Sequence, residues 1–478
     1  MAVAALLSAA VAARGRRLPP GPAPWPLLGS LHLLAGHSSP FAAFSRLGRR
    51  YGPVFLLRLG TAPCVVVTSL ALVKEVLVTK GAHFGGRPDF LRYHALFGGD
   101  RNNSMALCDW SILQKKRRSI ARMYCSPRFS APNYEHLSQV GVEETQELVQ
   151  ALSSWTRKPL DLKPLLLAAC GNMFTGYMCS TRFDYQDEEF VRVVRYFDQI
   201  FWEINQGYAV DFMPWLRPVY RGHLKKLSCW AHDIRKFILT RIIEHHRATL
   251  DLTKPPRDFT DALLIHLEED PDLDWEHIIF ELEDFLGGHS AIGNLAMLVF
   301  AAVIKNPEVG KKIQEEVDMV IGDREITLFD RVNMPYTEAT LLEALRTSSS
   351  PIVPHVATQD TTIADYDIPK GTVVFLNNFE LNTGSLYWEE PERFKPERFI
   401  CESGQIVKPE HFIPFSTGKR TCIGQRLVQG FSFLIVGSIL QKYDISSHNP
   451  EEVKTFEACV ALPPDTFKIV LTERNLST

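Results

Sequence analysis

The sequence predicts a mainly α-helical protein with a minor β portion. Apolar residues recur at helical spacing over most of the chain, whereas short β-branched runs are confined to a few places. Hydrophobic residues make up 45% and charged residues 22% of the 478 residues, which is typical of a globular chain with a large core. No Gly/Ser linker, repeat or low-complexity tract separates independent units. We therefore expect one large domain over residues 19–478.

Helical periodicity marks the long stretches 136–156, 187–206, 223–250, 275–305 and 307–321. The stretch 275–305 is exceptional because a helix of eleven or twelve residues is usual. Asp274 can cap its start, and Asn306-Pro307 can end it. Gly287 and Gly288 lie in its middle, and each costs about 1 kcal/mol relative to alanine in a helix interior. A compensating role at this point of the helix is therefore expected.

The predicted strands form a small β portion. Val54–Leu59 and Cys64–Thr68 are apolar and β-branched, and the turn residues Gly60-Thr61-Ala62-Pro63 between them predict a hairpin. Further strands are expected at Val373–Leu376 and near Lys468–Thr472.

Charge and cysteine usage exclude several classes of protein. The net charge of -3 argues against nucleic acid as a partner, since a phosphate-binding surface would shift the balance toward lysine and arginine. The basic runs Lys115–Arg118, Lys225–Lys226 and Lys419–Arg420 are each explained by a solvated helix face. Nine cysteines without a C-x-x-C pair indicate free thiols in a reducing compartment.

The first residues are apolar and precede a basic, proline-rich segment. Met1–Ala13 would rise about 20 Å as a helix, which is short of the roughly 30 Å hydrocarbon core of a bilayer. A secretory signal would carry its basic residues before the apolar run, but here Arg14, Arg16 and Arg17 follow it. Residues 1–18 are therefore predicted to be a short membrane-anchoring or interfacial segment.

The most informative stretch runs from Phe415 to Gly424 and reads FSTGKRTCIG. Cys422 lies in a glycine-flanked loop with Arg420 two residues before it, and an apolar helical stretch follows. A thiolate that binds haem iron needs backbone N–H donors, and glycines let the chain come close enough to supply them. The alternative is a free cysteine packed as a small hydrophobe, which we prefer for the other eight cysteines.

The loop matches F-x-x-G-x-R-x-C-x-G at every fixed position, and on this motif the chain resembles the cytochrome P-450 family of haem-thiolate monooxygenases. The resemblance implies the P-450 fold, haem b with Cys422 as the metal ligand, and O2 as co-substrate. It further implies attachment to the cytoplasmic face of the endoplasmic reticulum membrane. Electrons would come from NADPH-cytochrome P-450 reductase, which we expect to dock on a basic face built from Lys115, Lys116 and Lys419.

Further site residues follow from the resemblance, residue by residue. Glu343, Arg346 and Arg398 would form a structural charged triad, although E-x-x-R alone is a weak signal. The haem propionates would be bound by donors from several segments, with Lys115 replacing the basic residue that relatives often carry where this chain has Gln114. The expected cofactor-binding residues are Trp110, Lys115, His355, Phe415, Arg420, Cys422 and Gly424.

The distal helix departs from the family pattern. Relatives carry A/G-G-x-D/E-T, whose acid and alcohol steer protons toward dioxygen, but this chain has Gly287-Gly288-His289-Ser290-Ala291. Ala291 cannot donate a hydrogen bond, and Ser290 points about 100° away around the helix. Protons could come through water held by Ser290 or His289, or from a substrate hydroxyl. The predicted catalytic residues are Gly288, His289, Ser290 and Ala291.

Two other functions remain open at this point. The chain could be a haem-thiolate isomerase that rearranges peroxides without an external reductant. It could also be a non-catalytic haem-binding protein that sequesters a ligand.

The run from Gly287 to Asn294, together with residues 108–115, is similar to the arthropod Spook/Spookier group of the family. That likeness implies a sterol-like substrate and an early step of ecdysteroid (moulting hormone) biosynthesis from dehydrocholesterol. The substrate pocket would be lined by Phe285, Ala291, residues 351–356 and residues 460–464.

Overall fold

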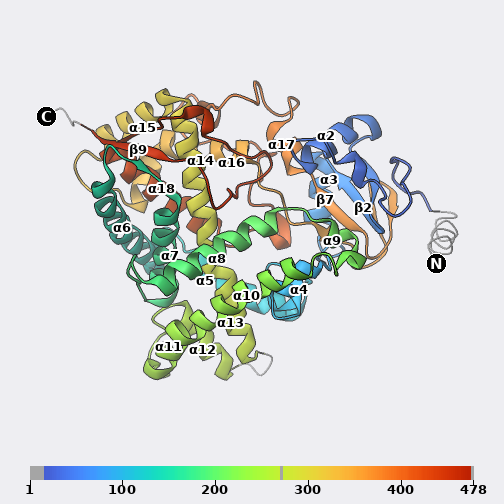
Figure 1. The fold of residues 1–478 in the computed structure, drawn as a ribbon, viewed down its shortest axis with the longest axis horizontal. Helices are drawn as coiled ribbons and strands as arrows, with labels where there is room; N and C mark the ends of the chain where they lie inside the picture. Colours follow the sequence, from blue (N-terminus) through green and yellow to red (C-terminus); the bar gives the residue numbers. More distant parts are fainter. Residues whose placement is uncertain (1–15, 270–272, 475–478) are drawn as a thin grey trace.

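The computed structural model describes residues 16–269 and 273–474 of the chain. The predicted anchor over residues 1–18 lies almost entirely outside the described residues. The described part is mainly helical with small sheets, as predicted (Figure 1).

The α-helices cover most of the length of the chain. Their bounds are α2 Pro40–Tyr51, α3 Leu70–Lys74, α4 Leu91–Leu96, α5 Ile112–Cys125, α6 Pro132–Leu152, α7 Lys163–Cys179, α8 Glu188–Asn205, α9 Ala209–Phe212, α10 Arg221–Phe237, α11 Glu244–Thr249, α12 Phe259–Glu269, α13 Trp275–Leu286, α14 His289–Lys305, α15 Pro307–Val320, α16 Pro335–Ser348, α17 Asn378–Thr383 and α18 Gln425–Lys442. The five stretches with helical periodicity are all confirmed as helical. The stretch 223–250 contains a π-helical segment, Ile238–Ile243, between α10 and α11.

The strands form three small sheets. β1 (Val54–Leu59), β2 (Ala62–Val67), β7 (Val373–Leu376) and β4 (His355–Val356) lie in the order β1-β2-β7-β4. The second sheet has the order β3-β9-β8, from Pro159–Leu160, Ile469–Glu473 and Tyr443–Ser446, and β5 (Thr361–Ile363) pairs with β6 (Tyr366–Ile368). The predicted hairpin and the strands near 373 and 468 are confirmed.

The hairpin turn is shorter than predicted. Leu59 pairs with Ala62, so the turn is Gly60-Thr61 alone, and Gly60 has a positive φ of 58°. Pro63 is part of β2 and lies opposite Arg58 of β1. A proline is tolerated there because β7 pairs with β2 only from Cys64 onward, so the proline lies beyond the end of that pairing.

The predicted helix over 275–305 has the expected ends but is divided in two. Asp274 caps α13 by accepting a hydrogen bond from the backbone N–H of His277 at 3.0 Å. At the glycine pair the backbone keeps right-handed dihedral angles, but Ser290 N and Ala291 N bond to carbonyls three residues back, which is 3₁₀ geometry. The prediction of one uninterrupted helix is therefore wrong at residues 287–288, where the loss of regular bonding divides it.

α13 and α14 cross the middle of the molecule (Figure 1). Within the described residues, Trp275–Lys305 is the one helical stretch long and apolar enough to span a bilayer, yet 83% of its most apolar window is buried in the protein. α14 packs against α7, α18 and α16, so its apolar surface faces these helices. This central helix places its middle over the loop that precedes α18.

Candidate active site

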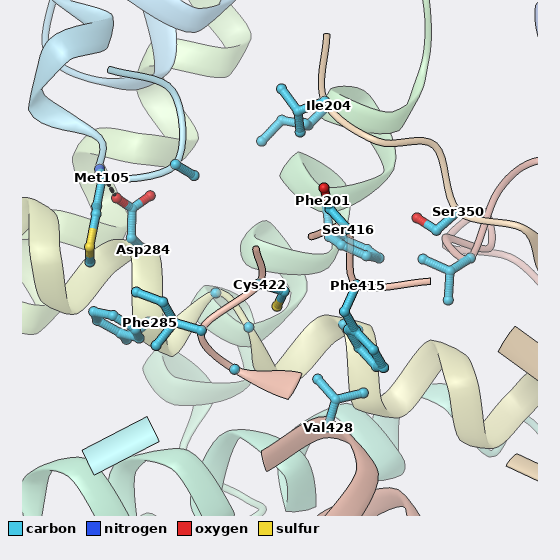
Figure 2. Close-up of a pocket in the computed structure, with 18 of the residues that line it drawn as sticks. Met105, Phe201, Ile204, Asp284, Phe285, Ser350, Phe415, Ser416, Cys422 and Val428 are labelled. Atoms are coloured by element: carbon cyan, nitrogen blue, oxygen red, sulfur yellow. Dashed lines mark hydrogen bonds between the residues drawn. The ribbon is translucent and has the colours of Figure 1, made fainter. Parts of the chain in front are cut away.

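Cys422 lies in the wall of a large internal cavity, just before the start of α18 (Figure 2). The loop is fixed by a hydrogen bond from the Cys422 N–H to the Phe415 carbonyl at 2.9 Å. Gly418 has a positive φ of 73°, and a Cβ on it would come within 2.1 Å of the Leu77 carbonyl oxygen. Only glycine fits there, so this glycine sets the path of the chain that presents Cys422.

The surroundings of the Cys422 sulfur include donors that could stabilise a thiolate ligand. Burial raises the pKa of this thiol, but the backbone N–H groups of Gly424 and Gln425 and the charge of Arg118 oppose that effect. These are donors that would stabilise a negative sulfur, and a thiol that coordinates a metal ion is deprotonated outright. Phe415 and Gly424 also line the cavity, and their roles as cofactor contacts stay predictions.

Three arginines, Arg87, Arg118 and Arg420, line the same cavity. In the described part of the chain each guanidinium group donates to backbone carbonyl oxygens and none to a carboxylate. Burial, and then the charge of the neighbouring Arg420, lowers the pKa of Arg118 to about 10 and that of Arg87 well below its usual range. Buried cations without a counter-ion are costly, so this wall is built for an anionic group.

Near these guanidiniums, Arg420 Nη1 and His355 Nε2 have no hydrogen-bond partner among the described residues, although His355 itself does not line the cavity. His355 is in β4, and its Nδ1 is 2.7 Å from the carbonyl oxygen of Phe84. Burial and the nearby Arg87 hold the pKa of His355 well below its usual range, so the ring is neutral. Arg420 Nη1 is a free donor that fits a carboxylate of a haem group, whereas a neutral His355 ring that donates through Nδ1 leaves Nε2 as an acceptor, so the haem-contact role of His355 stays a prediction.

Trp110 and Lys115 lie outside the cavity wall. The Lys419 ammonium group is 5.8 Å from the centre of the Trp110 ring, and Lys115 is on the exposed side of α5. Gln114 is buried and donates to the Met105 carbonyl at 2.5 Å. The cation that α5 contributes to the wall is Arg118, three residues after Lys115. The haem-contact roles of Trp110 and Lys115 stay predictions.

Sequence reasoning missed Arg87 and Arg118 as wall residues. Arg118 belongs to the basic run 115–118, in which only Lys115 and Lys116 were given roles beyond a solvated helix face. Its position two helical turns after Trp110 was the available signal. Arg87 stands in an irregular segment, where no periodic pattern marks it.

The four predicted distal residues divide into two pairs. Gly288 and Ala291 line the cavity, but His289 and Ser290 are buried behind it. His289 Nδ1 is 2.5 Å from the Leu286 carbonyl oxygen, and its ring packs edge-on to Phe197. Burial lowers its pKa.

Ser290 is fully buried, and its hydroxyl has no hydrogen-bond partner within the described residues. Neither Ser290 nor His289 therefore reaches the cavity directly. The catalytic roles proposed for the four distal residues stay predictions.

The predicted substrate pocket is found in part. Of the residues that the sequence indicated, the cavity is lined by Phe285, Ala291, Pro351, Ile352, Val353 and Val460. Helix α8 adds an apolar wall that sequence reasoning missed: Phe197, Ile200, Phe201 and Ile204. The cavity has a volume of about 460 Å³.

A closed ring of buried hydrogen bonds, also missed, lies behind the α8 wall. Asn294 donates to Asp198 Oδ1 at 2.8 Å and accepts from the Leu462 N–H at 2.8 Å. Lys163 completes the ring with Asp198 Oδ2 at 2.7 Å and the Leu462 carbonyl at 2.8 Å. The ring joins α7, α8, α14 and the loop that contains Val460.

The predicted charged triad is assembled as expected. Glu343 and Arg346 are fully buried and joined at 2.7 Å, and Arg398 Nε lies 3.1 Å from the same carboxylate. The carboxylate also accepts from the Lys395 N–H at 2.9 Å. This cluster fixes α16 to the segment that precedes the cysteine loop.

A mainly helical fold with a cysteine loop, a central helix over it and an unpaired arginine wall defines a haem-thiolate protein. The family model for "Cytochrome P450" matches residues 19–471. The chain belongs to the cytochrome P450 family, whose members are haem-dependent monooxygenases that bind haem b. They use dioxygen, a small-molecule substrate and electrons from a redox partner.

The curated relatives cover nearly the whole chain. Cytochrome P450 307a1 of Drosophila melanogaster is 51% identical over 95% of this chain and 89% of its own length. Cytochrome P450 2B2 of Rattus norvegicus is 32% identical over 95% and 94%, and cytochrome P450 1B1 of Homo sapiens is 31% identical over 96% and 88%. The similarity to the Drosophila protein agrees with the predicted arthropod group.

Proposed function

We propose that this protein oxidises a sterol-like substrate in an early step of ecdysteroid biosynthesis from dehydrocholesterol. The observation that carries the proposal is the cavity. Cys422 lies in its wall, and apart from the arginines and acids most of the residues that line it are apolar. An apolar, elongated substrate suits such walls because its burial is driven by the hydrophobic effect. The likeness of the distal helix to the Spook/Spookier group supports the choice of a sterol.

The residues of the chain divide the work at the cavity. Haem b, when bound, supplies the redox chemistry that inserts oxygen from O2. Cys422 would hold its iron, while Arg87, Arg118 and Arg420 would bind its carboxylates, and His355 would join them once its Nε2 carries a proton. The apolar α8 wall would exclude water and hold the substrate.

The product formed from dehydrocholesterol tests this function. We expect the holoenzyme with NADPH-cytochrome P-450 reductase to consume NADPH and to convert the sterol. Cys422→Ala should remove both the conversion and the absorption shift that reduced haem-thiolate proteins show with carbon monoxide. A wild-type enzyme that consumes NADPH only to release peroxide would contradict the proposal.

Ala291 makes proton supply the unusual part of the mechanism. The side chain has no donor, so a proton must come from water or from the substrate itself. We expect Ala291→Thr to lower turnover, because the added hydroxyl and methyl take the space that such a donor needs. Improved coupling of NADPH to product in this variant would mean that the alanine is merely tolerated.

The reductase is proposed to dock on the basic face around the cysteine loop. Lys115 and Lys419 are exposed there, and Lys116 lies beside them on α5. Charge reversal of Lys115 and Lys116 should slow reduction and weaken its salt dependence, because exposed charges steer association. An unchanged rate and salt dependence would refute this docking face.

Residues 1–18 are proposed to attach a single catalytic domain, residues 19–478, to the cytoplasmic face of the endoplasmic reticulum membrane. Removal of residues 1–18 should move the protein from the membrane fraction to the supernatant while the carbon-monoxide spectrum is retained. Retention of the shortened protein in the membrane fraction would contradict this attachment.

One observation favours a second candidate, a haem-thiolate isomerase: the distal helix has neither the acid nor the alcohol of the family motif. An isomerase that rearranges peroxides needs no such proton supply. Turnover of a lipid peroxide without any reductant would support it over the monooxygenase.

A further inference from the structure

We propose that Asp284 is a substrate-binding residue whose carboxylate accepts a hydrogen bond from a hydroxyl group of the apolar substrate. The inference rests on the proposed function, since it names the polar group by which the sterol-like substrate is recognised. It gives the cavity an orientation, with the hydroxyl end of the substrate at α13.

Asp284 occupies the cavity-facing stripe of the central helix. Asp284, Gly287, Gly288, Ala291 and Leu295 all line the cavity, at the spacing that places residues on one helical face. Asp284 lies seven residues before Ala291, which corresponds to about 10 Å along the axis. An elongated substrate can therefore contact both positions.

The carboxylate is held in place but keeps acceptor capacity. Oδ1 accepts from the Ser104 hydroxyl at 3.0 Å, and Oδ2 accepts from the Met105 N–H at 2.5 Å (Figure 2). The Ala106 N–H also interacts with this carboxylate. A carboxylate has about four lone-pair positions, so these three donors leave room for one more. Within the residues that the structure describes, no lysine or arginine forms an ion pair with Asp284.

The neighbouring acid, Glu283, provides a contrast. It also lines the cavity, but it is buried and both of its oxygens are engaged by Arg235 Nη1, at 3.1 and 3.2 Å. Asp284 is only half-buried, so it is the more accessible of the two acids.

The surroundings of Asp284 call for a hydrogen-bond donor. Phe97, Met105 and Phe285 make the nearby wall apolar, and a carboxylate in such a wall is costly unless it is hydrogen-bonded. Burial raises the pKa of Asp284 to about 6, against the opposing charge of Arg117. The group is therefore mostly ionised at neutral pH and can only accept.

A matched set of ligands and variants tests the proposal. We would measure binding to the holoenzyme by equilibrium dialysis, with dehydrocholesterol and its 3-deoxy counterpart as one pair and a hydroxylated C19 steroid and its deoxy counterpart as another. Asp284→Asn should weaken the hydroxylated member by roughly ten- to a hundred-fold and leave the deoxy member nearly unchanged. Ser104→Ala, which removes a tether and keeps the carboxylate, should retain the hydroxyl preference, as should Glu283→Gln.

Each outcome decides between the possibilities. Equal weakening of both members in Asp284→Asn would mean that Asp284 only anchors residues 104–106, and the proposal would be wrong. It would also be wrong if the wild type bound no ligand of either pair, or bound the hydroxylated and deoxy members equally. A preference for an aliphatic amine over the hydroxylated ligand would likewise contradict it, because the acid would then recognise a cation and not a hydroxyl group. Binding of the C19 pair alone, with the hydroxyl preference lost in Asp284→Asn, would support Asp284 and refute the sterol substrate.

Discussion

Asn294→Leu should loosen two walls of the cavity at once. In the buried ring, Asn294 is the residue of α14 that holds both Asp198 of α8 and the Leu462 N–H of the loop. Leucine is similar in size but has no polar atom. The substitution therefore removes both bonds, and a third from Asn294 Nδ2 to the Ser290 carbonyl, without opening a large hole.

The magnitude follows from the groups that lose their partners. A buried N–H without a hydrogen-bond partner costs about 1–3 kcal/mol, and a charged group costs more. Leu462 N and one oxygen of Asp198 would both be affected, although Lys163 still pairs with the other Asp198 oxygen at 2.7 Å. We expect the free energy of unfolding to fall by about 3–5 kcal/mol.

The assay combines stability and ligand binding. Urea unfolding of the holoenzyme, followed by circular dichroism, should show the loss of stability, and equilibrium dialysis should show weaker binding of dehydrocholesterol. The affinity should fall because Val460 and the α8 residues that line the cavity lose their common support. The carbon-monoxide spectrum should persist, since the cysteine loop is not part of the ring.

A matched control is Asn306→Leu, because Asn306 Nδ2, among the residues that the structure describes, bonds within its own helix end, to the Ala302 carbonyl at 2.9 Å. This variant should leave ligand affinity unchanged. If Asn294→Leu altered stability by less than about 1 kcal/mol and kept full affinity, the ring would not support the cavity walls.

Two further predictions concern buried charges away from the cavity. Glu343→Gln should lower the free energy of unfolding by about 3–5 kcal/mol, measured by urea denaturation, because the guanidiniums of Arg346 and Arg398 are left buried without their shared carboxylate. In the buried His246–Asp258 pair, both ring nitrogens face acceptors at 2.9 Å. Burial alone would lower the pKa of His246, but the hydrogen bond to Asp258 and its charge outweigh burial and raise it. The stabilisation is thus complete below the ordinary histidine pKa and is lost as pH rises through the raised value, so His246→Gln should destabilise more at pH about 6 than at pH about 9.

Exposed counterparts serve as controls for both. Glu390→Gln breaks an exposed pair with Arg393 and should have little effect. His232 is exposed, so His232→Gln should show no pH-dependent loss of stability. Equal effects of the buried and exposed variants would contradict the importance assigned to burial.

Local signals in the sequence were sufficient for the parts of the site that lie within one segment. The glycines, Arg420 and Cys422 are neighbours in the chain, so their spacing alone indicates a metal-ligating loop. The long central helix was found from its periodicity and its caps. Its division at Gly287 and Gly288 was not, because the bonding there depends on how closely the helix packs against α8, where a Cβ on Gly287 would lie 3.2 Å from Phe197.

Local sequence patterns could not show which side chains line the cavity, because that depends on segments far apart in the chain. Lys115 and Arg118 belong to one basic run, yet one is exposed and the other lines the cavity, because only packing decides which side of α5 is buried. His289 and Ser290 fit the family motif by position but face away from the cavity. Asp284 carried no motif at all.

The sequence by itself determined the helical class and predicted the thiolate ligand, since both depend on residues close together along the chain. The tertiary structure alone decided which cations converge without a counter-ion and which acids line the cavity. Burial and direction of a side chain are set by contacts between segments far apart in sequence, and no local pattern records those contacts.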